Sequence, residues 1–435
     1  MSSWLILTDK NIQKYFLLLF GISLSLGCFR FLFPFQVINI GGDVSLISIA
    51  STLFSIGQII SFMVLCKIII SNTHRFLLGG LSVLLITGSM TILSDPYILT
   101  LIRIFDGLGY GFIFLGIIAL ASNFEKREGE VLGNLFAAVL SGLALGQGVA
   151  GIFWAILLEY QIPADQSIQI VSGLMFIITF ILIIILNLIR VRENQSKSKS
   201  LNGWKWQHFH IKQGIRTLLM GPSILLVILI YIIYDFAHGI YTPNLSILLN
   251  QQGGISEVGI SLGYLVGDIT WGISQIFTGR LVDKVGSSLP LIFSLLAKGI
   301  VVFFYPEISI ILYLFLILFL AGLAEGFLEP ARNKAVLEIE VTQGYSHSHK
   351  HLDLGFSGSA SIVIGIHDHP HEHNMQQETI ISTLQTIGIM SFGIGSFFGS
   401  LLLINGQSLS FVTNIGGFCL IGASFLSIIF VILRK

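Results

Sequence analysis

The chain has 435 residues, of which 54% are hydrophobic and only 11% are charged, and its mean hydropathy is +0.86. A water-soluble protein of this composition would expose large apolar patches, so the composition excludes a soluble globule and indicates a chain that lies in a bilayer. The three cysteines have no paired spacing, which gives no support to a disulfide framework or a cysteine metal site. The formal net charge is zero, and nothing in the sequence indicates nucleic-acid binding.

Apolar runs long enough to cross the hydrocarbon core, roughly 18 residues or more, recur along the whole chain. We predict an all-α membrane protein with twelve transmembrane helices. Their predicted ranges are 14–36, 45–70, 75–94, 96–121, 130–158, 167–190, 219–248, 257–278, 288–305, 308–332, 378–404 and 409–432. The first run is too long for a signal-peptide core and lacks a small-residue cleavage site, so we expect it to be retained.

The basic residues are unevenly distributed between the two sides. Three of the 23 lysines and arginines, Arg30, Arg103 and Lys298, lie within predicted spans, and the other 20 lie at the termini or in loops of one side. The positive-inside rule therefore predicts that both termini are cytoplasmic. We expect a multi-pass protein of the plasma membrane, or of the inner membrane of a bacterium.

A polar, basic segment divides the predicted spans into six and six. We predict an N-terminal bundle at 1–190, a cytoplasmic linker at 191–218, and a C-terminal bundle at 219–435. The halves share glycine spacing, because Gly107 and Gly111 correspond to Gly322 and Gly326. A second correspondence, between Gly146 and Gly395, has an offset that is larger by 34 residues, which predicts a histidine-rich insertion at about 342–376 in one copy of a repeat.

Several motifs carry a resemblance to a known family. GRLVDKVG at 279–286 matches the inner-loop pattern G-x-L-x-D-R-x-G, and RIFDGLGYG at 103–111 is similar to the pattern R-x-x-x-G-x-G of a fourth span. With twelve spans and a long central loop, the chain resembles the major facilitator superfamily over nearly its full length. The resemblance implies two pseudo-symmetric six-helix bundles, transport by alternating access, and a central cavity lined by spans 1, 4, 7 and 10.

Most ionisable residues within the predicted spans fall in those four spans. Charged groups in hydrocarbon are costly and normally face an aqueous cavity or one another, which supports a polar transport path. The candidates for substrate or proton contact are Arg30, Arg103, Asp106, Asp235, His238 and Glu325. The first five lie at depths that would allow one cluster, whereas Glu325 lies nearer the inner mouth.

Two pairs within this set share a helical face at i,i+3 spacing. Arg103 with Asp106 is either an internal ion pair that neutralises the arginine or a proton-coupling unit. Asp235 with His238 is either a polar patch satisfied by tyrosines, a half-site for a transition metal, or a proton relay. The sequence names no partner for Asp268 or for Lys298, which lies too deep to reach the interface.

Charged residues near the predicted inner mouth indicate a gate. Glu329 is expected to pair with Arg332 or with Arg280 and Lys284, and the resemblance adds Asp283 to this network. Such pairs would break and re-form as the bundles rock.

Seven of the eleven histidines are concentrated in the insertion: His347, His349, His351, His367, His369, His371 and His373. Imidazole binds zinc, nickel, copper and iron, so the segment predicts contact with a divalent transition metal. It is either a polar loop that binds metal adventitiously or a device that captures, senses or stores metal.

The sequence thus predicts a proton-coupled secondary active transporter of a small polar or ionic solute. Alternatives are a transition-metal or metal-chelate exporter and, from another class, a membrane sensor on a transporter scaffold. No nucleophile or acid–base constellation predicts an enzyme, and no cofactor is required. The expected partners are the cargo and the lipid bilayer, and the expected state is a monomer.

Overall fold

The computed structural model describes residues 10–63, 72–121, 128–196, 222–342 and 372–434, and within these ranges the regular elements are all helices. The first half contains α1 (Lys10–Asn39), α2 (Val44–Met63), α3 (Asn72–Ile92), α4 (Pro96–Ala121), α5 (Glu128–Glu159) and α6 (Ala164–Ser196). The second half contains α8 (Pro222–Tyr241), α9 (Leu245–Gln251), α10 (Glu257–Val285), α11 (Ser288–Phe304), α12 (Ile311–Thr342), α13 (Glu372–Ile404) and α14 (Leu409–Arg434). Short 3-10 turns at Thr242–Asn244 and Tyr305–Glu307 extend α8 and α11.

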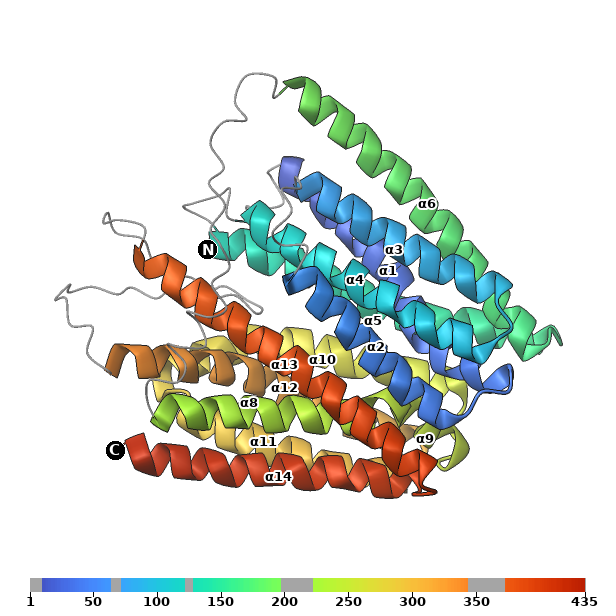
Figure 1. Cartoon of the computed structure of the whole chain (residues 1–435). Helices are drawn as coiled ribbons and strands as arrows, with labels where there is room; N and C mark the ends of the chain where they lie inside the picture. The colour runs from blue at the N-terminus through green and yellow to red at the C-terminus, as the bar shows by residue number, and fades with distance from the viewer. Residues whose placement is uncertain (1–9, 64–71, 122–127, 197–221, 343–371, 435) are drawn as a thin grey trace.

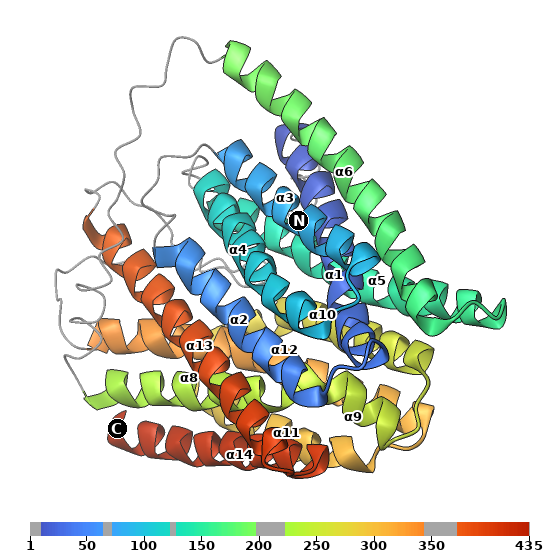
Figure 2. The same cartoon turned by 45° about the vertical axis from the view of Figure 1, so that its right-hand side comes forward.

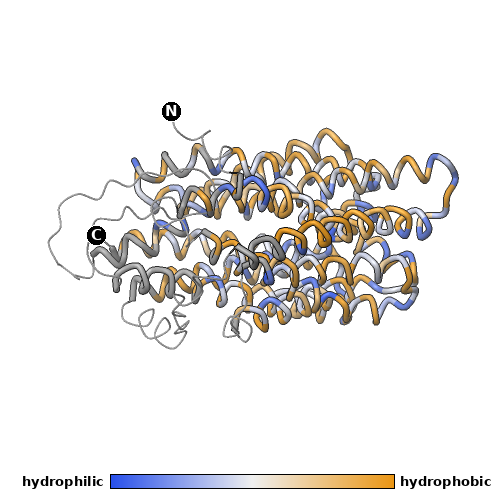
Figure 3. The backbone as a smooth tube through the Cα atoms, turned by 90° about the horizontal axis from the view of Figure 1, so that it is seen from above, coloured by the Kyte–Doolittle hydropathy of each residue, from blue (hydrophilic) through white to orange (hydrophobic). Residues whose placement is uncertain are grey.

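Eleven spans within the described ranges are long and apolar enough to cross a bilayer, which makes the chain an integral, multi-pass membrane protein. The remaining predicted span, 257–278, corresponds to α10. This helix has 29 residues and packs between α5 and α12, but its mean hydropathy is lower than that of the eleven spans. Asp268 and Gln275, with several glycines, serines and threonines, lower its apolar character. Figure 3 shows hydrophobic residues along most of the helix length and hydrophilic ones at the turns.

Helices continue beyond two of the predicted domain boundaries. The segment 191–196, predicted to be linker, belongs to α6, and α13 begins at Glu372 within the predicted insertion. The predicted span 219–248 is interrupted, because Pro243 lies in the 3-10 turn between α8 and α9. Proline lacks the N–H that a continuous helix requires, although Pro34 is accommodated inside α1.

The helices form two bundles, α1–α6 and α8–α14, which lie above and below one another in Figure 1. Contacts between the bundles run mainly along α2 with α13 and α5 with α10. Figures 1 and 2 show the bundles close together at the end that carries the short turns, such as 40–43 and 405–408, and diverging toward the end that carries Lys10 and Arg434. We call these the short-turn end and the terminal end.

Glycines explain how the helices within each bundle approach so closely. A Cβ on Gly107 of α4 would meet the carbonyl oxygen of Phe54, and one on Gly322 of α12 would meet the carbonyl oxygen of Gly267. One turn further on, Gly111 and Gly326 each face a serine, Ser61 on α2 and Ser274 on α10. The glycine spacing noted in both halves of the sequence therefore serves the same kind of contact in each bundle, as expected where packing rather than hydrophobicity joins helices.

Candidate functional site

Most charged side chains within the spans form two groups, one in each bundle, whereas we predicted a single cluster of Arg30, Arg103, Asp106, Asp235 and His238. The first-bundle cluster consists of Arg30 on α1 with Arg103 and Asp106 on α4. The second-bundle cluster consists of Asp235 on α8, Lys298 on α11, and Glu325, Glu329 and Arg332 on α12. At 1.5 Å per residue, the first lies about 10–15 Å and the second about 9–32 Å from the short-turn ends of their helices.

Asp106 is the centre of the first-bundle cluster. Its side chain is fully buried, and Arg103 forms both an ion pair and a hydrogen bond with it, as one of our two interpretations of this pair required. Arg30 approaches from α1, with 3.6 Å between its Nη2 and Oδ1 of Asp106. Two arginines against one aspartate leave the cluster with one surplus positive charge.

Aromatic rings hold the two guanidinium groups in place. The centre of the Arg30 guanidinium lies 4.8 Å from the ring centroids of both Phe54 and Tyr110. Arg103 is similarly surrounded, at 4.9 Å from Phe33 and 5.2 Å from Phe29. Cation–π contacts of this length fix the orientation of a cation without neutralising it. The two differ in exposure, because the side chain of Arg30 is 24% accessible and that of Arg103 only 10%.

Lys298, for which the sequence named no partner, pairs with Glu325 in the second-bundle cluster. Its Nζ lies 2.8 Å from Oε1 of Glu325, and the hydroxyl of Tyr234 donates a hydrogen bond of 2.5 Å to Oε2 of the same carboxylate. Both carboxylate oxygens are therefore satisfied, and one side chain joins α8, α11 and α12. Glu325 is thus occupied by structural partners in this conformation.

The remaining members of the second-bundle cluster depart from the predicted gate. Arg332 turns toward α8, with 3.5 Å from its Nη1 to Oδ2 of Asp235 and 4.2 Å from its guanidinium to the ring of Tyr231. Glu329 instead accepts a hydrogen bond of 2.8 Å from the amide of Gln275 on α10. Among the described side chains, Glu329 therefore pairs with Gln275 rather than with Arg332 or Lys284.

The three other residues of the predicted gate all lie on α10. Lys284 is exposed near the terminal end of α10, and the side chains of Arg280 and Asp283 lie outside the described ones.

The three acids and two bases of the second-bundle cluster leave it with one surplus negative charge.

Asp235 and His238 do not act as the pair that their spacing suggested. Asp235 faces Arg332, whereas the His238 ring lies among Tyr241, Tyr234 and Phe392, at centroid distances of 5.5, 5.8 and 5.9 Å. Among the side chains that the structure describes, no group of three or more histidine, cysteine, aspartate or glutamate residues is suited to hold a metal. Six of the histidines of the insertion lie outside the described residues, and so does the side chain of His373.

Polar contacts join the bundles near the short-turn end, and we call them the seam. The amide of Asn244, in the break after α8, donates to the hydroxyl of Ser48 on α2 at 2.6 Å. The amide of Gln147 on α5 donates to Oδ2 of Asp268 on α10 at 3.3 Å, and the hydroxyl of Ser261 donates to the carbonyl oxygen of Gln147 at 2.9 Å. Asp268, also without a predicted partner, therefore bridges the two bundles.

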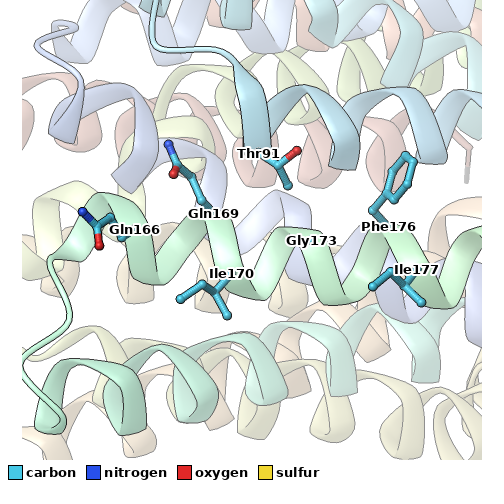
Figure 4. Close-up of a pocket in the computed structure, with 7 residues that line it drawn as sticks. All are labelled: Thr91, Gln166, Gln169, Ile170, Gly173, Phe176 and Ile177. Atoms are coloured by element: carbon cyan, nitrogen blue, oxygen red, sulfur yellow. The ribbon is translucent and has the colours of Figure 1, made fainter.

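A shallow groove at the surface of the first bundle lies away from both clusters. It runs between α3 and α6 and is lined by Thr91, Gln166, Gln169, Ile170, Gly173, Phe176 and Ile177 (Figure 4). Ile170 and Ile177 are exposed, as expected of a surface that faces lipid, and no charged side chain lines the groove. The two charged clusters are therefore the better candidate site.

Two bundles of membrane-spanning helices, each with a buried cluster of ionisable side chains, define a polytopic membrane protein of the transporter type. The sequence model of the Major Facilitator Superfamily matches residues 15–339, and the chain belongs to this family. The crystal structure of a mutant of the nucleoside transporter NupG is similar in fold, with a TM-score of 0.66 and 9% sequence identity over 98% of this chain and 100% of that one. The comparison with curated proteins gives no match.

Proposed function

We propose that the chain is a proton-coupled secondary active transporter that moves a small polar or ionic solute by alternating access. The proposal places the terminal end in the cytoplasm, because the basic residues concentrate there, and in a plasma or bacterial inner membrane. Membership of the family supports a transporter rather than an enzyme.

One observation carries the proposal: each of two bundles that are joined at one end holds a buried cluster of oppositely charged groups. The side chains of Arg30 and Asp235 are 24% and 18% accessible. A charged side chain at membrane depth is stable where water or cargo can reach it, so these exposures support a polar transport path. The seam closes the short-turn end while the helices diverge toward the terminal end (Figure 1), which corresponds to an inward-facing state. Opening the seam would give the outward-facing state.

Proton coupling is assigned to Glu329 and Asp268 because of what holds them. The other three carboxylates of the spans each face an arginine or a lysine, so a proton would have to displace an ion pair. Glu329 and Asp268 accept from the neutral amides of Gln275 and Gln147 instead. Each can take up a proton while keeping its neighbours in place. Asp268 lies in the seam, so its protonation would also act on the contact between the bundles.

A reversible lock on the seam tests the mechanism. The cysteine pair Ser48→Cys with Asn244→Cys, in a chain whose three native cysteines are replaced, joins two positions now linked by a 2.6 Å hydrogen bond. We expect the disulfide to abolish solute-driven proton movement in proteoliposomes and reducing agent to restore it, because the short-turn end could not open.

The matched control is Asn250→Cys with Glu257→Cys, which joins two positions of the second bundle at the same end, now linked by a 3.2 Å hydrogen bond. This cross-link should leave transport intact. Undiminished transport with the Ser48–Asn244 positions cross-linked would rule out alternating access through the seam.

A further inference from the structure

We infer that the cargo is a small organic monoanion and that Arg30 binds its carboxylate from the space between the bundles. This inference rests on the proposed function and names the substrate class of the same site. It is carried by the charge, the orientation and the accessibility of one side chain.

The charge of the first-bundle cluster calls for an anion. Asp106 is shared between two guanidinium groups, and Arg103 takes the closer contact as both ion pair and hydrogen bond. Arg30 is left at 3.6 Å, beyond hydrogen-bonding distance. Its buried Nε and Nη2 make no hydrogen bond within the part of the chain that the structure describes. A buried, incompletely paired cation is costly, and a bound anion would relieve that cost.

The orientation of Arg30 selects a planar partner. Phe54 and Tyr110 each lie within 4.8 Å of its guanidinium, and Nε and Nη2 are buried, so the approach left to a ligand is from the side of Nη1. A guanidinium donates within its plane in a fixed fork, and the two oxygens of a carboxylate match that fork. The rings therefore pre-organise Arg30 for carboxylate recognition, a role in which a flexible lysine would be a poorer substitute.

The second-bundle cluster limits the charge of the cargo to one. Its surplus negative charge would repel a dianion more strongly than a monoanion, whereas Arg30 would repel a cation. A monoanion neutralises the surplus of the first-bundle cluster, and one proton on Glu329 neutralises the surplus of the second. Carboxylate and proton would then cross together without net charge movement.

Matched ligands provide the first arm of the test. Gluconate and lactate are compared with their uncharged amides, gluconamide and lactamide, and with the nucleoside uridine, in proteoliposomes under an imposed pH gradient with protein-free liposomes as blank. We expect uptake of at least one carboxylate and no uptake of its amide. Binding is read separately, as a rise in the melting temperature of the detergent-solubilised protein.

Variants of Arg30 provide the second arm. Arg30→Gln should weaken carboxylate binding about 10- to 100-fold, the range expected for losing a charged hydrogen-bond partner. Arg30→Lys, which keeps the charge without the fork, should recover part of the affinity. Lys14→Gln removes an exposed cation from the same helix, α1, and should bind as the wild-type chain does.

The outcomes separate the inference from the proposed function. Proton-coupled uptake of uridine or of an amide, with no carboxylate taken up, would overturn the inference and leave the transporter proposal standing. Carboxylate uptake and binding that Arg30→Gln leaves unchanged, in a variant that melts as the wild type does, would overturn it too. If no solute moves and none raises the melting temperature, both fail.

Discussion

The two charged clusters differ in how their members are satisfied. In the second bundle, Glu325 is held by a lysine and a tyrosine at hydrogen-bonding distance, and the carboxylate of Glu329 is held by a glutamine. In the first, one aspartate serves two arginines, and the side chain of Arg30 is 24% accessible, against 14% for Arg332 of the second. In both arginines two buried nitrogen atoms make no hydrogen bond with the described groups, Nε and Nη2 of Arg30 and Nε and Nη1 of Arg332. The difference suggests a division of labour, in which the first bundle receives an anion and the second receives a proton and holds its helices together.

The largest effect expected from this comparison is on stability. Lys298→Met leaves the buried Glu325 without its cation and should lower the free energy of unfolding by about 3–5 kcal/mol, the usual cost of breaking a buried ion pair. Arg103→Met should cost less, because Arg30 remains beside Asp106. Melting temperatures in one detergent measure both.

The control is the double variant Lys298→Met with Glu325→Gln, which removes both charges and should recover much of the loss. If Lys298→Met melts at the wild-type temperature, the second-bundle cluster is not the more tightly interlocked of the two.

The second-largest effect is expected on proton-driven accumulation of cargo, which can be separated from cargo binding and exchange. One pH unit across the membrane can drive about tenfold accumulation of a solute that moves with one proton, since 1.4 kcal/mol corresponds to a factor of ten. Glu329→Gln should abolish this accumulation while leaving exchange of cargo across the membrane, because Gln275 can still bond the new amide and no ion pair is lost. Initial rates and plateau levels in proteoliposomes give the two readings.

Glu307→Gln, an exposed carboxylate at the short-turn end, provides the matched loss of charge and should accumulate cargo as the wild-type chain does. Undiminished accumulation by Glu329→Gln would move the proton site elsewhere, with Asp268 next to be tested.

The spans, the family and most helices that carry the clusters could be predicted from the sequence, because hydrophobic length and glycine spacing are local properties. The partners could not. Lys298 reaches Glu325 from a neighbouring helix, and Tyr234 reaches it across 91 residues, so both pairings depend on how each helix is rotated in its bundle. The i,i+3 rule succeeded for Arg103 with Asp106 and failed for Asp235 with His238, where Arg332 competes for the carboxylate.

The neutral partners were missed for a different reason. Gln147, Gln275 and Asn244 carry no charge, so a criterion based on ionisable residues within spans does not select them. A signal was available, since an amide in the middle of a membrane span is costly unless it is bonded. Counting buried amides beside charges would have pointed to the seam.

The smallest effect expected concerns the histidine-rich insertion, which interrupts only the second half of the chain. Replacing the seven histidines between 347 and 373 by serine keeps its length and should abolish binding of zinc or nickel, measured by equilibrium dialysis. Cargo transport without added metal should change by less than about twofold, because the histidines lie in sequence outside the spans that carry both clusters. The unsubstituted chain, assayed with and without metal, is the control.

Added metal would sharpen the comparison between the bundles. The helix α12 carries Glu325, Glu329 and Arg332 and continues without interruption to Thr342, where the insertion begins. Metal held there would therefore act first on the second-bundle cluster, and a change in rate that the serine variant lacks would identify the insertion as a sensor of the coupling side. Movement of the metal itself through the wild-type chain would instead favour the metal exporter. The cargo would then bind in the second bundle, to which we assign the proton.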